Sequence, residues 1–151
     1  MSEPVQMPAK LLTILAVKDA DDGAVIVFKE RDAGGRLQKD HPFFVQFKEL
    51  AEICAEEQSR LAVTLDPAGR VQDLALADRD VVRSAAEIQG DDVEVTFLGH
   101  SGIYKLQRGH PDFGRILERL TQSQQSQGPV WFGFDSQSLA ILDVVADAGG
   151  G

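Results

Sequence analysis

The sequence contains one cysteine, Cys54, and three histidines, so few residues are available for redox or metal chemistry. A single cysteine excludes an internal disulfide, which fits a reducing compartment. No histidine or cysteine has a second such residue at the spacing typical of zinc ligands. We therefore expect neither a bound metal nor a cofactor.

Long apolar runs and basic stretches are also missing. No apolar run approaches the roughly 20 residues that are needed to span a bilayer. The segment Met1–Pro4 lacks the basic and apolar regions of a signal peptide, and we expect a cytoplasmic protein. The net charge is −9, and no basic stripe is present to contact phosphates, so we expect neither a nucleic-acid nor a membrane partner.

An internal repeat is the strongest pattern that is present. The segment Leu37–Phe44 recurs as Leu106–Phe113, 69 residues later, with a His-Pro pair at the same place in both copies. The correspondence continues beyond the segment, for example from Asp66 to Asp135. A fixed offset over about thirty residues predicts one structural unit that is used twice.

Hydrophobic periodicity predicts an α+β fold made of two tandem ββαββ units. In the first unit we expect strands at 11–17, 24–28, 61–65 and 71–76 and a helix at 42–59. In the second unit we expect strands at 93–98, 103–106, 130–134 and 139–145 and a helix that Pro111 opens. The polar stretch from Gln122 to Gly128 loses the apolar stripe, and we expect the helix to fray there.

A short helix is expected to join the two units. Asp78 is a suitable N-cap, Val82 and Ala85 share an apolar face, and Gly90 ends the pattern. The expected organisation is a loose arm (1–9), the first unit (10–77), a linking helix (78–90), the second unit (91–146) and a flexible glycine tail (147–151).

His41 and His110 are the most tempting candidates for chemistry, because equivalent positions of a duplicated fold can approach each other. Together with His100 they would suffice for a three-histidine metal site. In both copies, however, the histidine directly precedes the proline that opens the helix. There a ring nitrogen can accept a hydrogen bond from an unpaired backbone N–H, so we interpret His41 and His110 as structural helix-cap residues.

Three further motifs fail on inspection. Gly99–Gly102 begins like the G-x-S-x-G elbow of hydrolases, but Ile103 stands where the last glycine is required. The acidic turn Asp19–Gly23 has its glycine one position too early for a calcium loop. Cys54 lies on the apolar side of its helix, which predicts a buried and inert thiol. We therefore identify no catalytic residue.

Trp131 is the residue that we expect to make an intermolecular or inter-unit contact. Strand alternation points Val130 and Phe132 into the core and Trp131 to the opposite face. Large aromatic side chains bury much area. Trp131 is therefore expected either to pack against the other unit or to contact a partner.

The end of the chain gives the repeat a second interpretation. A ββαββ unit followed by Gly150 and Gly151 resembles the β-grasp family of ubiquitin-like modifiers and sulfur carriers. That resemblance implies activation and conjugation through the terminal glycine. A tandem pair of OB-like barrels is a third interpretation, since a helix before the last two strands also suits that fold.

The function predicted from these patterns is that of a non-catalytic cytoplasmic binding or adaptor protein with a protein partner. Trp131 and exposed strand edges would form its contact surface, because a sheet edge can accept a partner strand. An enzyme would need a pocket that gathers a histidine with carboxylates from distant segments. The identity of the partner and the oligomeric state are left open at this stage.

Overall fold

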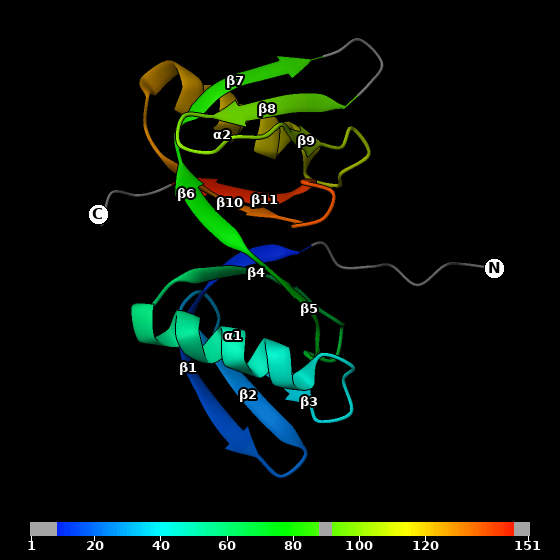
Figure 1. The fold of residues 1–151 in the computed structure, drawn as a ribbon. Coiled ribbons are helices and arrows are strands. Elements are labelled where there is room, and N and C mark those ends of the chain that lie inside the picture. The colour runs from blue at the N-terminus through cyan, green and yellow to red at the C-terminus, as the bar shows by residue number, and fades with distance from the viewer. Residues whose placement is uncertain (1–8, 88–91, 147–151) are drawn as a thin grey trace, which may run out of the picture. The chain divides into compact units, whose positions relative to one another are not determined.

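A computed structural model describes residues 9–87 and 92–146, which form a mixed α+β fold with 11 strands in three sheets and 2 helices (Figure 1). The chain divides after Leu74 into two compact units. No helix in the described ranges is long and apolar enough to cross a membrane. The terminal segments 1–8 and 147–151 lie outside the description.

Unit 1 consists of one helix and one five-stranded sheet. Its elements are β1 (Lys10–Ala20), β2 (Gly23–Phe28), β3 (Gly35–Gln38), α1 (Phe44–Glu57), β4 (Arg60–Leu65) and β5 (Val71–Ala75). The strand order is β3-β2-β1-β4-β5. A parallel bridge between Arg36 and Arg70 also joins the beginning of β3 to the segment before β5, so the two edge strands of the sheet meet.

Strand β1 bends (Figure 1) and changes its pairing partner after Thr13, with a register shift between Ile14 and Ala16. Up to Thr13 the strand pairs antiparallel with β4, and from Ile14 onward it pairs antiparallel with β2. The carboxylate of Glu30 accepts hydrogen bonds from the backbone N–H and the hydroxyl of Thr13, both at 2.6 Å. These bonds supply partners for polar groups that the bend would otherwise leave unpaired.

The core of unit 1 lies between α1 and its sheet. Helix α1 buries Ala51 and Cys54, and Cys54 is therefore buried as predicted. Burial, and to a smaller extent Glu57, raises the pKa of the Cys54 thiol. The fully buried aliphatic residues around the helix are Ile14, Ile26, Leu37, Leu61 and Val63.

Unit 2 has one helix and two three-stranded sheets. Its elements are β6 (Ala77–Asp80), β7 (Val82–Glu87), β8 (Val93–Phe97), β9 (Tyr104–Leu106), α2 (Phe113–Ser126), β10 (Val130–Phe134) and β11 (Ile141–Ala146). The strand orders are β11-β10-β6 and β7-β8-β9. A parallel bridge between Lys105 and Ala140 links β9 to the residue before β11.

The expected linking helix over 78–90 is wrong, because its described residues form the strands β6 and β7. Strand β6 pairs with β10, and β7 pairs with β8. The chain bends at Val81 between them, which brings Val82 to the core directly after it. The bend interrupts the alternation of inward and outward residues, and the resulting spacing of the apolar residues resembles that of a helix. The remainder of that prediction, 88–90, lies outside the described residues.

The expected ββαββ order is incomplete in both units. No strand was expected where the four-residue strand β3 lies, and unit 1 therefore has three strands before its helix instead of two. Unit 2 has four, because β6 and β7 belong to it. Short strands next to glycines carry too few alternating positions to be recognised by pattern.

Helix α2 extends to Ser126 and does not fray after Gln122 as expected. Its buried positions are Ile116, Leu120 and Ser123. The Ser123 hydroxyl donates to the carbonyl of Gly128 at 2.6 Å and accepts the backbone N–H of Val82 at 3.1 Å. Ser123 is polar but continues the buried face of α2. This explains why the apolar pattern in the sequence ends before the helix does.

Candidate functional site

His41 and His110 have the same hydrogen bonds in the two units. Nδ1 accepts the backbone N–H two residues later, that of Phe43 at 3.0 Å and that of Asp112 at 2.9 Å. Nε2 donates to the carbonyl of Gln72 at 2.9 Å and to that of Leu142 at 2.7 Å. These partners assign the neutral Nε2–H tautomer and leave neither nitrogen for a metal or a proton transfer.

The helices begin at Phe44 and Phe113, so each His-Pro pair lies in the turn just before its helix. Each histidine therefore ties this turn to a carbonyl of the last strand of its unit.

His100 lies between two carboxylates. Its Nδ1 is 2.5 Å from Oδ2 of Asp80, and its Nε2 is 3.0 Å from Oδ2 of Asp78. Asp80 also accepts the backbone N–H groups of Val81 at 2.7 Å and Gly99 at 2.8 Å. The cluster thus fastens the loop between β8 and β9 to strand β6.

The carboxylates keep His100 protonated over a wider pH range than usual. Burial by itself lowers the pKa of His100, but the hydrogen bonds with Asp80 and Asp78 outweigh burial and raise it. Burial likewise acts to raise the pKa of Asp80, but the bonds from His100 and from two backbone N–H groups lower it overall. Both ring nitrogens of His100 lie within hydrogen-bond distance of carboxylate oxygens, and this arrangement favours an imidazolium that is paired with carboxylates.

This cluster brings a histidine and carboxylates together from distant segments, as an enzyme would require. Both ring nitrogens of His100 are nevertheless occupied by carboxylate oxygens. Throughout residues 9–87 and 92–146, no group of three or more His, Cys, Asp or Glu side chains is arranged to hold a metal ion. The cluster of His100, Asp78 and Asp80 therefore has the geometry of a structural tie between the β8–β9 loop and strand β6, and we call it the His100 latch.

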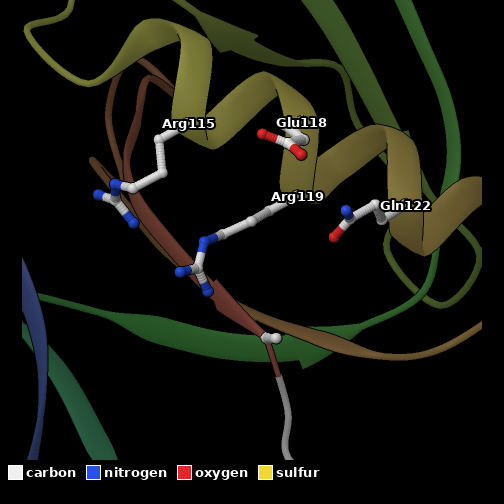
Figure 2. A pocket seen from close by; sticks show the side chains of 5 residues that line it. Arg115, Glu118, Arg119 and Gln122 are labelled. Atoms are coloured by element: carbon white, nitrogen blue, oxygen red, sulfur yellow. The ribbon is translucent and has the colours of Figure 1, made fainter.

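A second polar site lies on the outer face of α2, where a hollow of about 290 Å³ opens beside the end of β11 (Figure 2). Its walls are Arg115, Glu118, Arg119 and Gln122 from the helix and Ala146 from the strand. The four helical residues are spaced three and four apart, so they lie along one face of α2. A smaller hollow of about 180 Å³ shares Arg119, Gln122 and Ala146 with it and continues toward Pro129.

Arg115 is fixed in this wall by its neighbours. Its guanidinium donates to Oδ1 of Asp143 at 2.7 Å, to the carbonyl of Val144 at 3.2 Å and to Oδ2 of Asp112 at 3.3 Å. Asp143 is 3% exposed, so Arg115 compensates a buried carboxylate. Burial acts to lower the pKa of Arg115, but the bond with Asp143 raises it overall.

Arg119, one helical turn later, has no such partner among the residues that the structure describes. Its side chain is half-buried, and within the described parts of the chain no carboxylate lies within ion-pair distance of it. Figure 2 shows its guanidinium extending away from α2 toward strand β11. Its charge is therefore available to a ligand in a way that the charge of Arg115 is not.

The other residues singled out in the sequence lie elsewhere. Trp131 is half-buried on β10, between Arg79 of β6 and Val145 of β11. Gly150 and Gly151 lie outside the described residues. The turn at 99–103 is followed by strand β9, whereas a hydrolase elbow requires a helix there.

The sequence analysis missed Arg115 and Arg119. Their spacing of four residues on a predicted helix was a visible signal. That spacing does not reveal that Asp143, 28 residues away, pairs with Arg115, whereas Arg119 pairs with no carboxylate that the structure describes.

No protein-family model matches this chain, and no curated protein matches it closely enough to be a relative. Its function is therefore argued from the geometry of the sites.

Proposed function

We propose that this chain is a non-catalytic cytoplasmic binding protein that engages a protein partner through the hollow on α2. The observation that carries the proposal is Arg119, a half-buried residue whose guanidinium faces a hollow without a carboxylate partner in the described ranges. Arginine is also the residue most suited to recognising a planar anionic group.

The state of the histidines supports a non-catalytic role. His41, His100 and His110 each have both ring nitrogens hydrogen-bonded to protein groups. A general base needs a nitrogen within reach of a substrate proton. A binding role requires no rearrangement of these hydrogen bonds, whereas catalysis by a histidine would require one of them to break.

We infer that the scaffold is a duplicated OB-like barrel. Supporting this inference are the offset of 69 residues between the two copies and two helices of 14 residues each. If β1 corresponds to β6 and β7 together, the strand pairings of the two units run in the same order. A five-stranded barrel with a bent first strand is typical of OB-like modules, which bind extended ligands.

The described strands favour the OB-like alternative over the β-grasp alternative. The β-grasp resemblance rested on a ββαββ order, whereas three strands precede α1. It also rested on a terminal glycine outside the described residues. Trp131 remains a proposed second contact residue, on a different face of β10 from Val130, which lines the smaller hollow.

The test is affinity capture with the full-length chain from extracts of its own source cells, followed by direct titration of the purified partner. Arg119→Gln removes the charge that faces the hollow. Arg83→Gln removes an equal charge from an exposed position on β7 and is the matched control. We expect saturable binding that is weakened about tenfold or more only by Arg119→Gln.

Equal binding by all three proteins contradicts the proposed surface. Turnover of a substrate by the purified chain, lost in a histidine variant, contradicts the proposed class of function. A Trp131→Ala variant tests the second contact in the same assay.

A further inference from the structure

We infer that the hollow on α2 binds a single carboxylate, presented by a peptide segment of the partner with neutral neighbours. This inference rests on the proposed function and names the chemical group that the hollow receives. It is carried by the guanidinium of Arg119, which pairs with no carboxylate among residues 9–87 and 92–146, by the charges around it and by the lining of the adjoining smaller hollow.

Arg119 is the arginine of this hollow that pairs with no carboxylate in the described ranges, and the carboxylates nearby limit the negative charge that a ligand can carry. Arg115 is already neutralised by Asp112 and Asp143. Glu118 lines the same hollow as Arg119 and carries a negative charge. A phosphate group, with a charge of about −1.5 to −2 at neutral pH, would be repelled by Glu118 more strongly than a carboxylate.

The donors of the hollow match a carboxylate in shape. The guanidinium of Arg119 presents parallel N–H groups that suit two carboxylate oxygens. The exposed amide of Gln122, three residues along the helix, borders the same hollow and can donate a further hydrogen bond. Within the described part of the molecule, the side-chain amide of Gln122 makes no hydrogen bond to another protein group.

The surroundings favour neutral residues next to that carboxylate. The smaller hollow is bordered by Pro129, Val130 and Ala146, which offer apolar surface to an adjoining side chain. The whole chain carries a charge of −9, which repels a segment rich in acidic residues at long range. One acidic group followed by a small apolar residue satisfies both conditions.

The corresponding helix of unit 1 shows that the arginines are not demanded by the helix position. Helix α1 has the same length as α2, and the residues 69 positions before Arg115 and Arg119 are Gln46 and Leu50. A similar helix therefore forms without either charge. Arg119, which pairs with no carboxylate in the described ranges, is thus not required to form the helix, as expected of a ligand-binding residue.

The test is an NMR titration of the uniformly ¹⁵N-labelled full-length chain. The probes are acetyl-Ala-Asp-Val-amide, its Asn analogue, acetyl-Ala-Ala-Val with a free terminal carboxylate, and inorganic phosphate. We expect saturable shifts of amides in α2 and at Ala146 with the Asp peptide or the free-carboxylate peptide. Affinity for the Asn analogue is expected to be at least about tenfold lower.

The two carboxylate probes distinguish an acidic side chain from a chain terminus, and stronger binding of either supports the inference. Arg119→Gln is expected to weaken binding about tenfold, while Arg83→Gln leaves it unchanged. Equal binding of the Asn analogue, preferential binding of phosphate, or no saturation with any probe overturns the inference. Capture of a partner that depends on Arg119 would survive that result, so the two proposals fail separately.

Discussion

At the scale of single residues, the two arginines of α2 have opposite roles although they lie one turn apart. Arg115 pairs with a carboxylate that is almost completely buried, whereas Arg119 faces the hollow without a carboxylate in the described ranges. Removing one partner of a buried charge pair leaves the other charge buried without compensation. Removing Arg119 leaves no such charge among the described residues.

This difference predicts opposite effects on stability. Arg115→Gln is expected to lower the free energy of unfolding of unit 2 by about 1–3 kcal/mol, because Asp143 loses its charged donor. Arg119→Gln is expected to change it by less than about 0.5 kcal/mol. Urea unfolding followed by Trp131 fluorescence measures this, since Trp131 is the only tryptophan and lies in unit 2. Equal destabilisation by both variants would show that Arg119 is structural.

The His100 latch predicts how stability depends on pH. The pKa of His100 is raised in the folded state, so its stabilising effect is complete below the unfolded pKa of about 6.5 and is lost as pH rises through the folded pKa. The pKa of Asp80 is lowered, so its contribution exists above its unfolded pKa and is lost as pH falls.

Unit 2 is therefore expected to lose stability as pH rises above about 6.5. The groups that face His100 are Asp78, Asp80 and Tyr104, and burial raises the pKa of Tyr104 above its ordinary value. His100→Gln is expected to flatten the dependence. The urea midpoint, followed by Trp131 fluorescence at a series of pH values, measures it. An unchanged slope in the variant would assign the dependence to another group.

At the scale of elements, the bends of β1 and of the β6–β7 segment determine how each unit closes. In both bends a backbone carbonyl accepts a hydrogen bond at 3.0 Å, from Lys29 to Thr13 and from Leu98 to Val81. In both bends a carboxylate also accepts the N–H of the bend residue, from Glu30 in unit 1 and from Asp80 in unit 2. A strand that changes partners needs such side-chain acceptors, because the ladder is interrupted there.

Removing the acceptor is expected to loosen the bend of β1. Glu30→Ala leaves the N–H and hydroxyl of Thr13 without their partner, at a cost of about 1–3 kcal/mol because Thr13 is buried. Glu30→Gln retains an acceptor oxygen and is expected to cost less. Native-state hydrogen exchange of the Thr13 and Ile14 amides measures the loosening. Unchanged exchange in Glu30→Ala would show that the bend does not depend on this carboxylate.

The elements also show what the sequence could predict. Both helices, and the strands with regular alternation such as β4, β8 and β10, were expected close to where they lie. The bend at Val81 broke the alternation and was mistaken for a helix. Ser123 ended the apolar stripe although it is buried, because its hydroxyl is satisfied by Gly128 and Val82. Local patterns fail where a distant partner makes a polar or bent position favourable.

The sites were less predictable than the elements. The His-Pro pair before each helix is visible in the sequence, but the carbonyls of Gln72 and Leu142 that the histidines contact are 31 and 32 residues away. The latch at His100 likewise joins residues about twenty positions apart. Such pairings depend on strand order, which periodicity does not determine.

At the scale of the whole chain, charge limits the kind of partner. With a net charge of −9, the protein repels polyanions at long range. Arg119 in the α2 hollow can nevertheless attract an anionic group at short range. Added salt screens both effects, since the Debye length is about 8 Å at physiological ionic strength. A partner that presents one carboxylate among neutral residues therefore gains the local attraction with little long-range repulsion.

The most direct test of the central claim is calorimetric titration of the captured partner into wild-type protein, Arg119→Gln and Arg83→Gln. The account predicts that wild type and Arg83→Gln bind equally and that Arg119→Gln binds about tenfold more weakly at unchanged stability. Equal affinity for all three proteins would contradict the assignment of the α2 hollow as the binding site.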